Sequence, residues 1–119
     1  MEFLNDEKKK TLTNFVLFVK DELKLKKVPK IIIKNNRDGL KTTANYIFDK
    51  QINVCGKNRA LVDILRSIAH EMMHHKQYEN GELETKPDDI LSEIEDTAHA
   101  IAGQLIKKFA KVESTIYDT

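Results

Sequence analysis

The sequence of 119 residues contains no tryptophan, one cysteine, two prolines and four glycines. A single cysteine, Cys55, cannot form a disulfide within the chain, so a reducing compartment is the expected setting. No apolar run approaches the roughly 20 residues that a membrane-spanning helix needs. The N-terminal residues also lack the apolar segment of a signal peptide. We therefore expect a cytoplasmic protein with no membrane partner.

The chain also lacks an excess of charge of one sign. Its 20 lysine and arginine residues face 19 aspartate and glutamate residues, which gives a formal net charge of +1. Proteins that bind nucleic acid usually present a dense basic face, and the lysines at 8–10 and 24–27 come without a set of stacking aromatic residues. The sequence therefore predicts no nucleic-acid partner. Its length and its 40% of hydrophobic residues suit one core, so we expect a single domain over residues 1–119.

Hydrophobic periodicity predicts three helices and three strands. In the first helix, apolar side chains from Leu12 to Leu23 recur at the spacing of one buried helical face. The β-branched and alternating runs that follow are typical of strands. The expected helices cover residues 6–26, 59–80 and 87–111, and the expected strands cover residues 30–34, 41–48 and 51–55. This order predicts an α+β domain with a short three-stranded sheet.

Turn and capping residues indicate where these elements end. Val28-Pro29 is expected to stop the first helix, because the residue before a proline avoids the helical region. Asn58 is expected to cap the second helix, and Gly81 to end it. The β-branched strand at 30–34 is expected to be buried, whereas the alternating strand at 51–55 is expected to be half-buried.

The second predicted helix contains His70-Glu71-Met72-Met73-His74, an HExxH motif. Four residues turn an α-helix by about 400°, so the two histidines lie on one face, one turn apart, and can hold one metal ion. Glu71 lies one step round the helix, where its carboxylate can take a proton from water on that ion. The apolar residues around the motif favour a metal site over two unrelated surface histidines.

A catalytic zinc ion usually takes three protein ligands and leaves one position for water. The short connection after the second helix makes the third helix an antiparallel neighbour, so the third ligand is expected there. The candidates on that helix are Glu93, Glu95, Asp96 and His99.

Helical geometry ranks these four residues. Glu95 lies about 80° from the centre of the apolar stripe, and Glu93 lies about 120° away on the other flank. The small residues Ala98 and Ala102 allow the two helices to approach closely beside Glu95. We therefore predict Zn²⁺ bound by His70, His74 and Glu95, with Glu93 as the second choice for the third ligand.

Two stretches resemble known metallopeptidases. His70-Glu71-x-x-His74 followed by Glu95-Asp96-Thr97-Ala98-His99-Ala100-Ile101-Ala102 resembles the gluzincins, in which the glutamate is followed by alanine three and seven residues later. The fourth place, which holds an aspartate or asparagine that braces the first zinc histidine in that class, is His99 here. The approach from residue 63 to residue 77 is also similar to small metallopeptidases of tailed bacteriophages. The resemblance covers residues 59–109 and implies a minimal zincin fold.

The implied activity is hydrolysis of peptide bonds by a zinc-activated water, with Glu71 as the general base and a peptide or protein as the substrate. Gluzincins usually add a tyrosine or histidine electrophile. Tyr78 and Tyr46 are candidates, although packing is the stronger expectation for both. His75 is expected at the surface or behind a ligand, and the strand at 41–48 is a candidate for pairing with an extended peptide.

The alternative is a non-catalytic zinc-binding or protein-interaction module on the same fold. If Glu71 serves only in packing, Glu71→Gln should keep zinc and change no activity, whereas loss of a general base should keep zinc and abolish hydrolysis. Only the peptidase requires Glu71 as a base, so Glu71→Gln discriminates between them.

Overall fold

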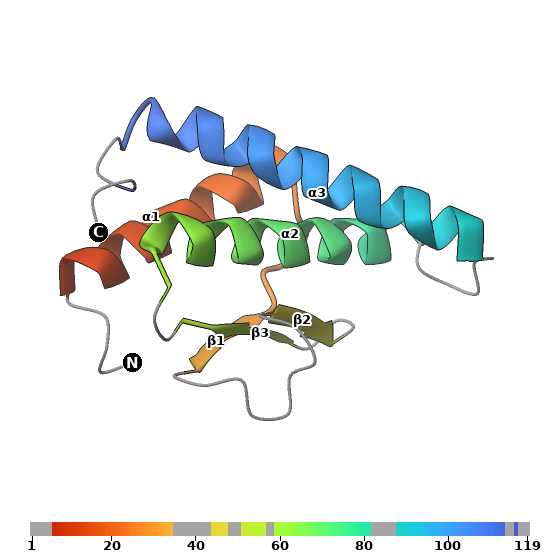
Figure 1. Cartoon of the computed structure of the whole chain (residues 1–119), viewed down its shortest axis with the longest axis horizontal. Coiled ribbons are helices and arrows are strands. Elements are labelled where there is room, and N and C mark those ends of the chain that lie inside the picture. Colours follow the sequence, from red (N-terminus) through yellow and green to blue (C-terminus); the bar gives the residue numbers. More distant parts are fainter. Residues whose placement is uncertain are drawn as a thin grey trace.

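The structure, a computed structural model, describes residues 6–34, 44–47, 51–56, 59–81, 88–113 and 116. The elements in chain order are α1 (Asp6–Leu23), β1 (Lys30–Lys34), β2 (Ala44–Ile47), β3 (Gln51–Cys55), α2 (Leu61–Glu79) and α3 (Asp88–Ala110) (Figure 1). The described residues thus form three helices and a small mixed sheet. The predicted α+β class is confirmed.

The sheet has the strand order β1-β3-β2. β1 runs parallel to β3, with Lys30 opposite Gln51 and Lys34 opposite Cys55. β2 runs antiparallel to β3, with Ala44 opposite Val54. β3 is therefore the central strand, and β2 is an edge strand on the side away from β1.

This strand order reverses the predicted burial of two strands. β1 was expected to be buried, yet Ile33 is its only buried residue, because β1 lies at an edge. β3 was expected to be half-buried, yet every residue after Gln51 is buried, because β3 lies between two strands. Asn53 tolerates this burial because the side-chain amide of Gln51 donates a hydrogen bond of 2.9 Å to Asn53 Oδ1.

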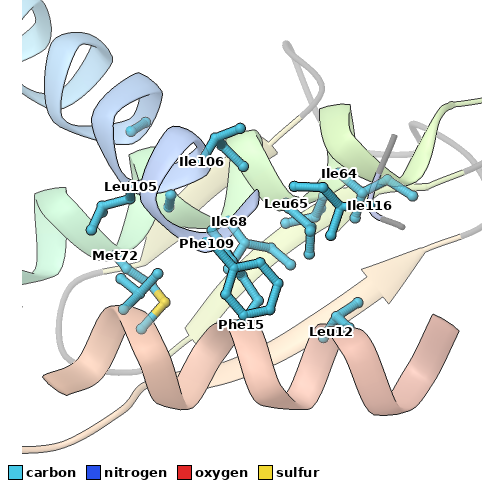
Figure 2. Packing of buried hydrophobic residues seen from close by; sticks show 14 of the residues in the cluster. Leu12, Phe15, Ile64, Leu65, Ile68, Met72, Leu105, Ile106, Phe109 and Ile116 are labelled. Atoms are coloured by element: carbon cyan, nitrogen blue, oxygen red, sulfur yellow. The ribbon is translucent and has the colours of Figure 1, made fainter. Parts of the chain in front are cut away.

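α2 lies between the sheet on one side and α3 on the other, and α1 packs against α2 (Figure 1). Apolar faces of the three helices meet in one core (Figure 2). Phe15 of α1 meets Phe109 of α3 edge to face, with ring centroids 5.1 Å apart. The HExxH helix is therefore held on several sides, which fixes the direction of the side chains on its remaining face.

α1 ends at Leu23, three residues earlier than predicted, and Val28-Pro29 does not end it. Lys24 adopts a left-handed backbone conformation with φ of 53°. Lys24 N donates to Asp21 O and Leu25 N donates to Lys20 O, the pair of hydrogen bonds of a Schellman motif. The sequence did not indicate this end of α1, because the left-handed position is usually occupied by glycine or asparagine and here is occupied by Lys24.

α2 begins at Leu61, with Ala60 as its N-cap residue and no side-chain capping hydrogen bond. The predicted cap at Asn58 is wrong, and Asn58 itself lies outside the described residues. The predicted end is confirmed, because Gly81, the residue after the C-cap residue Asn80, has φ of 75°. None of the helices, over the residues that the structure describes, has the length and apolar character needed to cross a membrane.

Candidate metal centre

α2 brings the two motif histidines together at one edge of its buried face. His70 Nε2 and His74 Nε2 lie 3.2 Å apart, and the ring planes meet at 83°. The side chains of His70 and His74 are 24% and 10% exposed. Ile68 and Met72, on the adjoining face, are fully buried in the core. The helix therefore presents both Nε2 atoms to one point at the boundary between core and solvent.

α3 brings the carboxylate of Glu95 to the same point. Glu95 Oε1 lies 2.5 Å from His74 Nε2, and Glu95 Oε2 lies 3.3 Å from His70 Nε2. Ala98 and Ala102 are both buried, as expected for a close approach between α2 and α3. The structure thus brings together the three residues that the sequence proposes as ligands.

The other candidates on α3 are placed differently. The side chains of Glu93 and Asp96 are exposed to solvent. His99 is also exposed, and its ring centroid lies 6.4 Å from that of His70, compared with 4.8 Å between the rings of His70 and His74. His99 is therefore a neighbour of the pair of histidines, one helical turn beyond Glu95.

These distances fit a small metal ion. Two ligand atoms of a tetrahedral zinc ion, each about 2.0–2.1 Å from the metal, lie about 3.3 Å apart. The separations of His70 Nε2 from His74 Nε2, 3.2 Å, and from Glu95 Oε2, 3.3 Å, match this spacing. The third separation, 2.5 Å between His74 and Glu95, is shorter, and the exposed Glu95 side chain is the partner with room to move. Two imidazole nitrogens and a carboxylate are also a donor set that zinc prefers.

Glu71 is buried beside this cluster. His70, Glu71 and His74 each offer one potential ligand atom, and these atoms lie within 4.8 Å of one another. Glu71 is therefore a second candidate for the third ligand, beside Glu95, whose carboxylate oxygens lie 2.5 Å and 3.3 Å from the two imidazoles.

Burial changes the acid–base properties of the cluster. Desolvation raises the pKa of Glu71 to about 7, with a further increase from the charge of Glu95 and an opposing effect of His74. Burial, and then the neighbouring His74, lower the pKa of His70. A lowered pKa favours the neutral imidazole, which is the form that binds a metal ion.

One of the two expectations placed His75 at the surface. Its side chain is instead fully buried. Tyr46 OH lies 2.6 Å from His75 Nδ1, and Glu79 Oε2 lies 3.1 Å from His75 Nε2. The Glu79 carboxylate also accepts hydrogen bonds from the backbone amides of Lys26 and Lys27. These contacts tie α2 to the edge strand β2 and to the segment that follows α1.

The same contacts favour a packing role for the two candidate tyrosines. A carboxylate only accepts, so His75 Nε2 carries the proton and His75 Nδ1 accepts the hydroxyl proton of Tyr46. That proton is therefore not available to a substrate. The ring of Tyr78 stacks on His75 at an interplanar angle of 22° and meets the ring of Tyr46 edge to face.

Sequence reasoning missed Gln77 as a residue of the site. Its side chain is buried, and its Oε1 lies 2.8 Å from His74 Nδ1. Its Nε2 donates a hydrogen bond of 3.1 Å to the carbonyl of Ile94, the residue before Glu95. The only signal in the sequence was a polar side chain three residues after His74, on the same helical face.

Comparisons of the chain with known protein families, with curated proteins and with solved structures find no match.

Proposed function

We propose that this chain is a zinc-dependent metallopeptidase with a minimal zincin-like fold of the gluzincin type. The observation that carries the proposal is the convergence of His70 Nε2, His74 Nε2 and the Glu95 carboxylate within 2.5–3.3 Å of one another, with Glu71 buried beside them. The spacing and the donor types suit zinc, and the adjoining carboxylate suits hydrolysis.

Zinc, when bound, supplies a Lewis acid that polarises the substrate carbonyl and makes water acidic enough to lose a proton near neutral pH. His70, His74 and Glu95, on α2 and α3, would hold the ion. Glu71 accepts the proton of the attacking water and returns it to the leaving amine nitrogen. The raised pKa of Glu71, about 7, suits a group that both takes and gives a proton near neutral pH.

The edge of the sheet offers a surface for an extended peptide. Among the described strands β2 pairs with β3 alone, so it lies at an edge of the described sheet. β2 also packs against α2, the helix that carries the motif. A substrate that adds to this edge as a further strand would be bound through backbone hydrogen bonds, with little regard to its sequence.

Zinc titration of the metal-free protein tests the ligand set. Glu95→Ala is the test variant, and Glu93→Ala, which removes another exposed carboxylate from the same helix, is the matched control. We expect one zinc ion per chain for the wild type and for Glu93→Ala, and an affinity lower by at least about tenfold for Glu95→Ala. Equal affinities for all three proteins would remove Glu95 from the ligand set.

Hydrolysis of a library of quenched fluorescent peptides tests the reaction. Glu71→Gln keeps the size of the side chain and removes the base. We expect it to retain zinc and to lose about 10²-fold to 10⁴-fold in rate. If the wild type binds zinc and cleaves no peptide, the non-catalytic zinc-binding module is the better description. Equal rates for the wild type and Glu71→Gln would exclude Glu71 as the base.

A further inference from the structure

Gln77 lies behind the candidate centre and is neither a proposed metal ligand nor the proposed general base. It is the third residue after His74 on α2, and its side chain is 1% exposed. Its amide contacts a group on each of the two helices that supply the ligands, namely His74 Nδ1 on α2 and the carbonyl of Ile94 on α3. A buried amide with a partner at each end has one favourable orientation.

The carbonyl of Ile94 determines that orientation. A backbone carbonyl can only accept a hydrogen bond, so the amide nitrogen of Gln77 faces Ile94 and donates to it across 3.1 Å. The amide oxygen of Gln77 then faces His74 Nδ1 at 2.8 Å. Because this oxygen can only accept, His74 Nδ1 carries the proton. His74 Nε2 is left with a lone pair, which points at Glu95.

In this arrangement, two hydrogen-bond acceptors, His74 Nε2 and the carboxylate of Glu95, face each other at the candidate centre. His74 Nε2 offers a lone pair, and a carboxylate oxygen of Glu95 lies 2.5 Å from it. Two acceptors at this distance repel each other unless a proton or a metal cation lies between them. With the opposite tautomer, His74 Nε2–H would instead donate to Glu95 and block the position of the ion.

We propose that Gln77 is a positioning residue, which holds His74 in the Nδ1–H tautomer required of a zinc ligand and ties it to the backbone beside Glu95. This inference deepens the proposed function and rests on it, because the ion is the one that His70, His74 and Glu95 would bind. Gln77 acts through two hydrogen bonds. The bond to His74 determines which nitrogen of that imidazole binds the metal. The bond to the Ile94 carbonyl holds α3, which carries Glu95, in position against α2, which carries the two histidines.

The two bonds can be separated by substitution. Gln77→Met has a similar volume and removes both bonds. Gln77→Glu keeps an oxygen that accepts from His74 Nδ1, and its ionised form cannot donate to the Ile94 carbonyl. The control is Gln104→Met, which makes the same chemical change at an exposed position of α3.

The first readout is the affinity for Zn²⁺, measured by competition with a chromophoric chelator. Loss of an outer hydrogen-bond partner of a metal ligand typically lowers affinity by about 10-fold to 100-fold. We expect that loss in Gln77→Met, a smaller loss in Gln77→Glu, which keeps the bond to His74 and loses only the bond to Ile94, and no change in Gln104→Met. An unchanged affinity in Gln77→Met, or equal losses in Gln77→Met and Gln77→Glu, would overturn the proposal.

The second readout is the tautomer of His74 in metal-free protein, assigned from long-range proton–nitrogen correlations of ¹⁵N-labelled samples at a pH where imidazoles are neutral. The proposal expects the Nδ1–H form in the wild type and a mixture of tautomers in Gln77→Met. A purely structural role for Gln77 would not move this signal. The Nε2–H form in the wild type would overturn the proposal. Failure of the wild type to bind zinc would instead refute the proposed function, and the two failures are therefore distinguishable.

Discussion

Replacement of Glu79 by alanine should destabilise the fold more than any ordinary surface substitution. The Glu79 carboxylate accepts hydrogen bonds from His75 Nε2 at 3.1 Å and from the backbone amides of Lys26 at 3.1 Å and Lys27 at 3.3 Å. The two amides lie in an exposed segment where water can replace the lost partner, so each should contribute about 0.5–1 kcal/mol. His75 is fully buried, and leaving its Nε2–H without an acceptor should cost about 1–3 kcal/mol.

The expected total is a decrease of about 2–5 kcal/mol in the free energy of unfolding, a large share of the ~5–15 kcal/mol typical of a domain. Urea denaturation followed by circular dichroism measures it. With a slope of about 1.5 kcal/mol per molar urea, the midpoint should fall by roughly 2 M. Glu79→Gln keeps one acceptor oxygen and should lie between the wild type and Glu79→Ala.

Glu22→Ala is the matched control for this prediction. Glu22 Oε1 lies 2.6 Å from Lys108 Nζ, but the two side chains are 34% and 63% exposed, so the ion pair should contribute about 0–1 kcal/mol. If Glu79→Ala were no more destabilising than Glu22→Ala, the reasoning would be refuted. The hydrogen bonds that link Tyr46, His75 and Glu79 would then have no role in holding α2 against β2 and the segment after α1.

Two further predictions concern the end of α1 and the contact between α2 and α3. Lys24→Gly should stabilise the protein by up to about 1 kcal/mol, because glycine adopts the φ of 53° without strain, and a thermal unfolding curve shifted to lower temperature would contradict this. Ala98→Leu should destabilise the protein by about 1–3 kcal/mol and weaken zinc binding, because the larger side chain separates the helix of Glu95 from the two histidines. Ala100→Leu, at an exposed position of the same helix, is the control for both measurements, and equal effects of the two substitutions would exclude this explanation.

Local periodicity was sufficient to locate the helices and strands, because the spacing of apolar residues reports the geometry of one element at a time. It was not sufficient to assign burial in the sheet. The residues in 30–34 and 51–55 do not indicate which strand becomes central, because strand order depends on pairing between segments that are distant in sequence. The order β1-β3-β2 buries Asn53 and leaves Ile31 and Ile32 only partly buried, the reverse of what their own chemistry suggests.

For the candidate centre, too, the sequence predicts some features and not others. The spacing of His70 and His74 determines their mutual position, because one helix carries both. The choice of Glu95 over Glu93 rested on the direction of each side chain relative to an apolar stripe and on the small residues Ala98 and Ala102, and the structure places Glu95 against both imidazoles. The role of Gln77 could not be predicted, because its second partner is a backbone carbonyl, and every residue has one.

The exposure of the candidate ligands bears on whether the site is catalytic or structural. Structural zinc sites are enclosed by four protein ligands, whereas catalytic sites keep one position open. Glu95 is 61% exposed and His70 is 24% exposed, so solvent reaches the cluster from the side of α3. The ring centroid of His99 lies 6.4 Å from that of His70, compared with 4.8 Å between His70 and His74. Glu71, the remaining carboxylate beside the cluster, is buried. An arrangement with three converging donors, a buried carboxylate and an open side favours a centre that admits a substrate over one that only holds the fold together.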